Sequence, residues 1–310
     1  MNGTGDKLTE NSLREILQPS YTYSSKPHGS SKEVVFSSSG DLNRAQRALK
    51  SAAQSLFSVL FPSDCRLCHA PLTSVSALPV CNLCLERVVP LSGILCDLCG
   101  EKLISSYLEA DPRCGLCRRV VPPFQKAVAY GAYEGSLRDL IHLFKYQHVK
   151  SAAPLLGGFL NRALAGTSLP AELLVVAVPL AKTRRRDRGF NQAEEIARAF
   201  VRRQRSVGIE LNTGSLVRTR DTASQTGLTR HQRRLNLRGA FAVTQPERIR
   251  DRSILLVDDV MTTGTTAGEC ARVLLRAGAK QVFVATAARA TKQAEISLPE
   301  QGVWAKPAHA

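Results

Sequence analysis

Four Cys-x2-Cys pairs between residues 65 and 117 constrain the fold of this 310-residue chain more than any other feature. Spacers of 12, 11 and 14 residues separate the pairs. A Cys-x2-Cys turn directs two thiolates at one ion, and two such turns complete a tetrahedral four-sulfur shell around Zn²⁺. We therefore predict two structural zinc sites in a small zinc-ribbon module, built from Cys65, Cys68, Cys81, Cys84, Cys96, Cys99, Cys114 and Cys117.

The spacing leaves the pairing of these turns open. Sequential pairing would give two stacked ribbons, whereas interleaved pairing would give a cross-braced module. An iron–sulfur cluster is the main alternative, because shells of four cysteines also hold iron. Disulfides are disfavoured because the cytosol keeps thiols reduced. The ninth cysteine, Cys270, lies on the apolar face of a predicted helix, where we expect a packed core thiol.

Changes in composition divide the chain into four parts. Residues 1–50 are rich in Ser, Lys, Gly and Asn, and we expect a disordered N-terminal extension there. A predicted helix over residues 42–60 precedes the cysteine pairs, and we assign residues 51–120 to the zinc-ribbon module. An α/β domain follows over residues 121–290, and residues 291–310 form a C-terminal tail.

Short apolar runs rich in β-branched residues predict buried parallel strands over residues 173–178, 254–257 and 281–287. An apolar spacing typical of a helix begins near Cys270, and Gly278 stands at the position expected for a C′ glycine. Strands and helices therefore alternate along this part of the chain. This alternation predicts an open, mainly parallel α/β sheet with helices on both faces.

The stretch ILLVDDVMTTGTTAG, residues 254–268, carries the clearest chemistry. Two adjacent carboxylates, Asp258 and Asp259, stand at the end of the predicted strand, where we expect them to face solvent. There they can accept hydrogen bonds from vicinal hydroxyls, such as those of a ribose. A loop rich in hydroxyls and backbone N–H groups leads from there into a helix, which suits a phosphate. No G-x-G-x-x-G or G-x-x-x-x-G-K-[ST] motif occurs in the chain. The loop consists of Thr262, Thr263, Gly264, Thr265 and Thr266.

Positive charge is concentrated in one part of the chain. The formal net charge is +16, and residues 181–240 hold fifteen Lys and Arg residues against five Asp and Glu residues. A local basic field implies an anionic partner, such as pyrophosphate or a nucleic-acid backbone. A solvated basic face is the plainer alternative. Aromatic residues make up only 5% of the chain, which counts against a dedicated stacking surface for single strands. The densest run contains Lys182, Arg184, Arg185, Arg186 and Arg188.

Apolar runs in the sequence are all short. None reaches the roughly 18 residues of a membrane-spanning helix, so we expect no membrane insertion. The N-terminus shows no basic segment followed by an apolar one, which predicts no secretory signal. We therefore expect a cytoplasmic protein.

The VDDVMTTGTT segment resembles the ribose-5-phosphate signature of type I phosphoribosyltransferases. Three further segments, at residues 133–146, 178–197 and 225–241, extend the likeness. Together with the cysteine pairs, they resemble the ComF/GntX-like family of competence-associated phosphoribosyltransferase-domain proteins. The resemblance covers about residues 56 to 289. It implies a type I phosphoribosyltransferase fold behind a double zinc ribbon.

The same resemblance implies a ligand, 5-phosphoribosyl-1-pyrophosphate (PRPP), which arrives with Mg²⁺. Asp258 and Asp259 would hold the ribose hydroxyls, and residues 262–266 would hold the 5′-phosphate. Residues 222–234 would form a mobile flap, and a hood around residues 130–145 would recognise the acceptor. The pyrophosphate would face the loop after the strand over residues 173–178, which contains Lys182, Arg184 and Arg188.

Two functions from different classes follow. The first is an enzyme that transfers the phosphoribosyl group to an unidentified acceptor. The second is a non-catalytic protein that binds PRPP or a nucleotide and handles single-stranded DNA during DNA uptake. A transcriptional regulator is a weaker third hypothesis, because no helix-turn-helix pattern is found. The sequence does not predict an oligomeric state.

Overall fold

The computed structural model describes residues 63–72, 76–103, 111–204, 208–221 and 230–290. The chain divides into two compact units, Met1–Val88 and Val89–Ala310. This boundary lies between the second and third Cys-x2-Cys pairs, so each half of the cysteine-rich segment belongs to a different unit. The expected extension, the helix predicted over residues 42–60 and the tail lie outside the described residues. The predicted domain boundaries stay predictions.

The described part of the first unit is a small loop-rich segment. An isolated bridge between Asp64 and Pro71 closes the turn that carries the first Cys-x2-Cys pair. Cys81, in an extended conformation, precedes helix α3 (Asn82–Glu86), so the second pair begins at the start of this helix. The first pair thus lies in a tight turn, and the second pair spans the first turn of α3.

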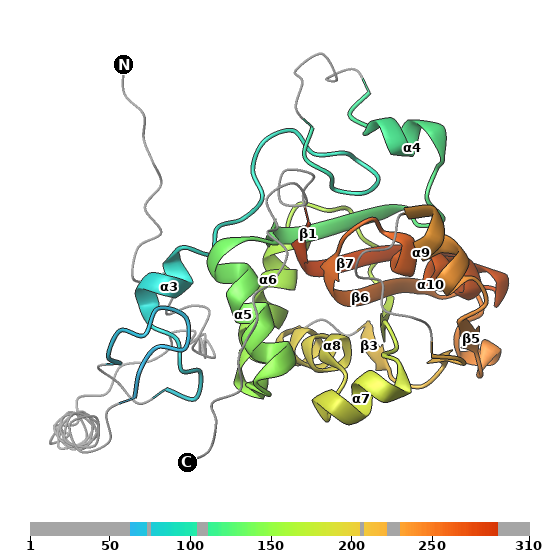
Figure 1. The fold of residues 1–310 in the computed structure, drawn as a ribbon. Coiled ribbons are helices and arrows are strands. Elements are labelled where there is room, and N and C mark those ends of the chain that lie inside the picture. Colours follow the sequence, from blue (N-terminus) through green and yellow to red (C-terminus); the bar gives the residue numbers. More distant parts are fainter. Residues whose placement is uncertain (1–62, 73–75, 104–110, 205–207, 222–229, 291–310) are drawn as a thin grey trace, which may run out of the picture. The chain divides into compact units, whose positions relative to one another are not determined.

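A five-stranded parallel sheet forms the centre of the second unit (Figure 1). Its order is β1-β7-β6-β2-β3, and every neighbouring pair is parallel. The three predicted strands are confirmed as β2, β6 and β7, and they lie in the middle of the sheet. The strands are β1 (Lys126–Ala132), β2 (Leu173–Ala177), β3 (Ile209–Asn212), β6 (Ser253–Met261) and β7 (Gln281–Arg289).

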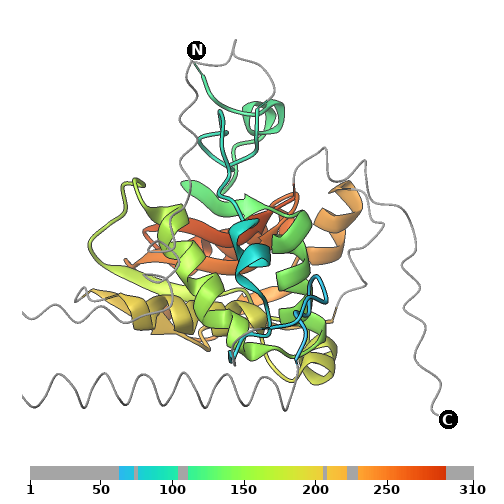
Figure 2. The same cartoon turned by 90° about the vertical axis from the view of Figure 1, so that its left-hand side faces the viewer.

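Helices cover both faces of this sheet, as expected (Figures 1 and 2). Helices α6 and α8 contact strands β1, β7, β6 and β2, whereas α10 contacts β6 and β7. The connections from β1 to β2 and from β2 to β3 move across the sheet in one direction, whereas the connection from β6 through α10 to β7 moves in the other. Right-handed crossovers therefore place α10 on the opposite face from α6 and α8. The helices are α4 (Gly115–Arg119), α5 (Gly135–Tyr146), α6 (Ala153–Leu164), α7 (Lys182–Arg188), α8 (Gln192–Arg203), α9 (Arg230–Leu237) and α10 (Thr265–Arg276).

Two short 3-10 helices and a hairpin-like pair of strands complete the described elements. The 3-10 helices are η2 (Lys150–Ala152) and η3 (Pro246–Arg248). Strands β4 (Leu216–Arg218) and β5 (Phe241–Val243) pair antiparallel outside the main sheet. Within the described residues, no helix is both long enough and apolar enough to cross a membrane.

The core lies between the sheet and its helices. The side chains of β2 and the first five residues of β6 are all buried. Cys270 on α10 is completely buried, which confirms the expected core thiol. Gly278 follows the C-cap of α10 with a φ of 96°, a left-handed conformation that favours glycine. The burial pattern explains why the central strands read as continuous apolar runs.

Two expectations about local structure are wrong. Strand β6 does not end before the two acids but continues to Met261, because β7 pairs with it as far as Met261 and Arg289. The basic run is not a loop but the short helix α7. The carboxylate of Asp221 accepts hydrogen bonds from the first two N–H groups of α7, and Gly189 ends the helix with a φ of 70°. A capping residue far along the chain is not visible from local sequence.

Candidate functional site

The eight clustered cysteines form two separate four-sulfur clusters. The first contains Cys65, Cys68, Cys81 and Cys84, and the second contains Cys96, Cys99, Cys114 and Cys117. Pairing is therefore sequential. Within each cluster the four sulfur atoms lie within 4.8 Å of one another, and all eight cysteines are free thiols rather than disulfides.

The sulfur geometry fits a zinc ion. A tetrahedron with Zn–S bonds of about 2.3 Å separates its sulfur atoms by about 3.8 Å. The Sγ atoms of Cys65 and Cys84 are 3.9 Å apart, and those of Cys99 and Cys114 are 3.7 Å apart. Each cluster therefore has room for one tetrahedral ion, and four protein ligands leave no open position for a substrate. We assign a structural role to both clusters.

Each cluster combines thiols whose pKa is lowered with thiols whose pKa is raised. Burial would raise the pKa of Cys65, but hydrogen bonds from the backbone of Cys81, Cys68 and Leu67 outweigh burial and lower this pKa to about 6. Burial raises the pKa of Cys99 to about 12, although the Arg289 guanidinium opposes the shift. Buried thiols of this kind ionise only with a cation beside them, so metal binding there releases protons.

The acidic pair, Asp258 and Asp259, is less exposed than we expect for residues at the end of a strand. Asp258 is half-buried, and Asp259 is only 9% exposed. The backbone N–H of Asp259 donates to Asp258 Oδ1 over 2.9 Å. Lys145 Nζ, on α5, forms an ion pair of 2.7 Å with Asp259 Oδ1. The expectation of two solvent-facing carboxylates is therefore wrong, because α5 covers one of them.

Lys145 is a site residue that reading the sequence missed. It was only the last position of the expected hood, although a lone lysine near the end of an apolar helix face is a usable signal. Burial would lower the pKa of Lys145, but the Asp259 carboxylate and Tyr133 outweigh burial and raise it. Lys145 therefore stays charged and neutralises one of the two adjacent acids.

Asp258 titrates near neutrality. Burial raises its pKa to about 7, the neighbouring Asp259 adds to the shift, and Lys145 and Arg188 oppose it. Near pH 7 this carboxyl group is therefore partly protonated. A ligand that needs the ionised form would bind more tightly as the pH rises.

The loop after β6 has the form of an anion cradle. Gly264 has a φ of 73°, and a Cβ atom there would lie 2.8 Å from Met261 Cε, so the turn requires glycine. Helix α10 begins directly after it at Thr265. The hydroxyls of Thr263 and Thr265 lie 2.8 Å apart. A helix N-terminus presents backbone N–H groups and a partial positive charge, which attract phosphates.

The predicted basic residues fall into two environments. The Arg188 guanidinium lies 4.9 Å from the Tyr146 ring centre and donates to Gln192 Oε1 over 3.0 Å. Its positive charge opposes the rise in the pKa of Asp258. Lys182 is exposed and Arg184 half-buried at the start of α7. Most of the predicted flap, residues 222–229, lies outside the described part. The ligand roles of all these residues stay predictions.

Known proteins resemble most of the chain. The family described as "Phosphoribosyl transferase domain" matches residues 186–304. "DNA utilization protein YhgH" of Escherichia coli K12 is 34% identical over 72% of this chain and 95% of its own length. "Competence protein F" of Haemophilus influenzae is 32% identical over 68% of this chain and 90% of its own length.

Two further matches are more distant. "Competence protein ComFC" of Bacillus subtilis is 25% identical over 64% of this chain and 79% of its own length. A hypoxanthine phosphoribosyltransferase structure from Staphylococcus aureus aligns with 44% of this chain and 62% of its own, at 12% identity and a TM-score of 0.27. That alignment is too weak to carry an argument. The curated relatives and the domain match show that this chain belongs to the ComF-like family of phosphoribosyltransferase-domain proteins.

Proposed function

We propose that this protein binds PRPP together with Mg²⁺ and transfers its phosphoribosyl group to an acceptor. One arrangement carries the proposal. The acidic pair, the threonine loop and the N-terminus of α10 follow one another directly at the carboxyl end of β6. Ligands of open α/β sheets bind at this edge.

Each part of PRPP has a counterpart in this arrangement. The 5′-phosphate would bind the backbone N–H groups and hydroxyls of residues 262–266. The ribose hydroxyls would donate hydrogen bonds to Asp258 and Asp259. Mg²⁺ would neutralise the pyrophosphate oxygens and keep several of its water ligands. Lys182, Arg184 and Arg188 would face the pyrophosphate.

Transfer breaks the bond between C1 of the ribose and the pyrophosphate oxygen, and a nucleophilic atom of the acceptor forms the new bond to C1. Positive charge develops on the sugar and negative charge on the leaving group. Preorganised cations lower the barrier for this separation without a protein nucleophile. Asp258 and Asp259, which would hold the ribose hydroxyls, would also stabilise the positive charge that develops on the sugar.

Titration calorimetry with PRPP, in the presence and absence of Mg²⁺, tests the binding step. We expect the variant Asp258→Asn/Asp259→Asn to lose PRPP binding. The control, Asp251→Asn, makes the same chemical change in the exposed turn before β6, at the opposite end of this strand. Asparagine tolerates the left-handed conformation of Asp251. Equal affinities in the wild type and the double variant would show that the ribose site is misplaced.

Release of pyrophosphate in the presence of candidate acceptors tests the transfer step. Tight PRPP binding without any release would favour the non-catalytic alternative. A second observation supports that alternative. Helix α7 exposes Lys182, Arg185 and Arg186. Two relatives of this chain carry the names "DNA utilization protein" and "Competence protein". We therefore propose single-stranded DNA as a second partner, and a cytoplasmic location for both functions.

A further inference from the structure

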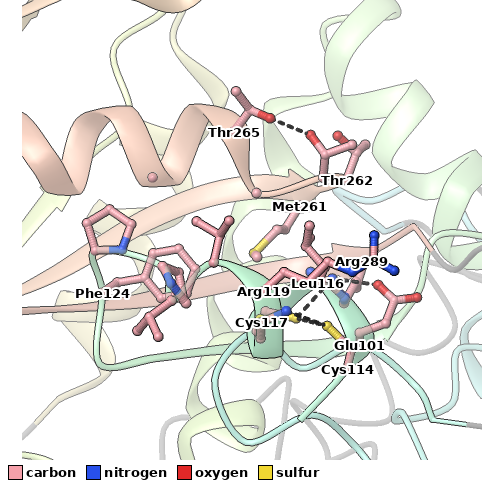
Figure 3. A pocket seen from close by; sticks show the side chains of 18 of the residues that line it. Glu101, Cys114, Leu116, Cys117, Arg119, Phe124, Met261, Thr262, Thr265 and Arg289 are labelled. Atoms are coloured by element: carbon pink, nitrogen blue, oxygen red, sulfur yellow. Dashed lines mark hydrogen bonds and ion pairs between the residues drawn. The ribbon is translucent and has the colours of Figure 1, made fainter. Parts of the chain in front are cut away.

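A pocket of about 540 Å³ lies in the second unit, beside the phosphate loop (Figure 3). Residues 262–265 line one side of it, and the second cysteine cluster lines another. Its volume is typical of small-molecule sites. Apart from the phosphate loop, no wall of this pocket has a ligand role assigned above. Apolar side chains form much of its wall: Leu116, Val120, Val121, Phe124 and Met261.

Arg289 lines this pocket and is only 4% exposed. Its Nη2 atom donates to Glu101 Oε2 over 2.6 Å and to Cys99 Sγ over 3.5 Å. Its Nε and Nη1 atoms are buried and have no hydrogen-bond partner in the described part of the chain. A guanidinium has five N–H donors, so three of them are left without an acceptor.

Such a group is costly in a folded protein. A buried donor without an acceptor loses its hydration and regains nothing. Native structures therefore pair nearly all buried polar atoms with protein, water or a ligand. An Arg289 guanidinium beside a cavity of ligand size is explained most directly by a molecule that accepts these hydrogen bonds.

Position along the sheet links Arg289 to the proposed ribose site. Arg289 ends β7 and pairs with Met261, three residues after Asp258 on β6. The N–H of Ala290 donates to the carbonyl of Met261 over 3.0 Å, which holds the two strand ends together. Arg289 therefore lies at the same carboxyl edge as the acidic pair and the phosphate loop.

We propose that this pocket binds the acceptor, that the second cysteine cluster forms one of its walls, and that Arg289 donates hydrogen bonds to an oxygen of the acceptor. The inference rests on the proposed transferase function. The apolar wall suits a ring system, and the free donors require a carbonyl or carboxylate oxygen. Glu101 already neutralises Arg289, and Glu269 pairs with Arg272, so the oxygen need not carry a full charge.

A matched pair of bicyclic probes, 2-naphthamide and 2-naphthoate, tests this assignment on the full, zinc-loaded chain. Their affinities can be measured by ligand-observed NMR titration. The test variant is Arg289→Met/Glu101→Gln, which removes both partners and leaves no unpaired carboxylate. The control is Arg252→Met/Glu210→Gln, which makes the same changes in an ion pair of 3.1 Å far from the carboxyl edge.

We expect at least one probe to bind the wild type and the control equally, and the test variant to lose at least about tenfold in affinity for it. A stronger naphthamide would indicate a carbonyl acceptor, and a stronger naphthoate a carboxylate. Leu116→Trp should also weaken the probes, because it fills the pocket from the side of the cluster. PRPP affinity, measured by calorimetry, should change less than about twofold in both variants.

Several results would overturn the assignment. One is that neither probe binds at millimolar concentration. Another is that the test variant binds the probes as tightly as the wild type does. A third is that the probes bind only after deletion of residues 291–310, which would make the chain's own end the occupant of the pocket. A parallel loss of PRPP affinity would assign Arg289 to the phosphate instead. If the wild type fails to bind PRPP, the proposed function is wrong, whereas a probe difference between the two double variants would still establish the Arg289 pocket.

Discussion

The two cysteine clusters share one motif but differ in their surroundings. In the first cluster Cys68 is exposed and Cys81 half-buried, and the Cys81 N–H donates to Cys65 Sγ within the cluster. In the second cluster all four cysteines are buried. There, Cys99 Sγ accepts a hydrogen bond from Arg289, which lies 190 residues further along the chain at the end of a central strand.

This difference shows that identical spacing can serve two structural purposes. A metal in the first cluster would order a short segment of its own unit. A metal in the second would support the edge of the sheet where the proposed ligands bind. A backbone contact also joins this segment to the edge strand of the sheet, since the N–H of Ala127, near the start of β1, donates to the carbonyl of Leu98 over 2.8 Å.

Substituting one cysteine in each cluster should give the largest contrast. Cys117→Ser should destabilise the second unit by more than about 3 kcal/mol, because it removes a buried metal ligand. Cys68→Ser should leave the melting temperature of that unit nearly unchanged. Scanning calorimetry measures both effects, and elemental analysis should show close to two zinc ions in the wild type and one in each variant.

Equal destabilisation by the two variants would contradict the contrast between the clusters. A zinc content near zero in the wild type, or the absorbance of an iron–sulfur cluster, would contradict the metal assignment itself.

Zinc release should show a smaller contrast. A colorimetric chelator should remove one ion at least about tenfold faster than the other, because exposed ligands open without unfolding the core. Arg289→Met should accelerate only the slow phase, since it removes the N–H···S contact to Cys99. A single release phase in the wild type, or acceleration of the fast phase in the variant, would show that the clusters are equivalent.

PRPP affinity and the stability of the second unit should both depend on pH through Asp258. Because the pKa of Asp258 is raised to about 7, PRPP affinity should increase several-fold from pH 6 to pH 8 as this carboxyl ionises. Between about pH 4 and 7 the folded state holds more protons at this site than the unfolded state, so Asp258 lowers stability as the pH rises.

Asp258→Asn should therefore raise the free energy of unfolding at pH 8 by about 1–3 kcal/mol, with little gain at pH 4. Chemical denaturation at both pH values measures this difference. The same gain at both values would indicate that the pKa of Asp258 is not raised.

DNA binding should give the smallest effect. Single-strand affinity should fall with salt by about 0.7 logarithmic units per neutralised phosphate. Arg184→Ala/Arg186→Ala on α7 should flatten this slope by about one unit. The matched control is Arg66→Ala/Arg87→Ala, two exposed arginines beside the first cluster, which should leave the slope unchanged. A slope that flattens only in the control would move the DNA surface to the first unit.

The sequence predicted the parts of the site that are continuous along the chain. Strand β6, the acids on it, the threonine loop and helix α10 form one uninterrupted segment, and their residue types alone indicate phosphate and ribose chemistry. Lys145 and Arg289 escaped prediction for the opposite reason. Each becomes informative only through a partner far away in the sequence, Asp259 for Lys145 and Cys99 with Glu101 for Arg289.

By itself, the sequence determined the family, the parallel α/β sheet and the eight clustered thiols as candidate metal ligands. These properties follow from local spacing and hydrophobic periodicity, which a linear chain displays directly. The tertiary structure decided how the turns pair, that α5 buries Asp259, and that the second cluster borders a pocket beside Arg289, two of whose nitrogen atoms lack hydrogen-bond partners among the described residues. Such features depend on burial and on contacts between distant segments, which arise only when the chain packs.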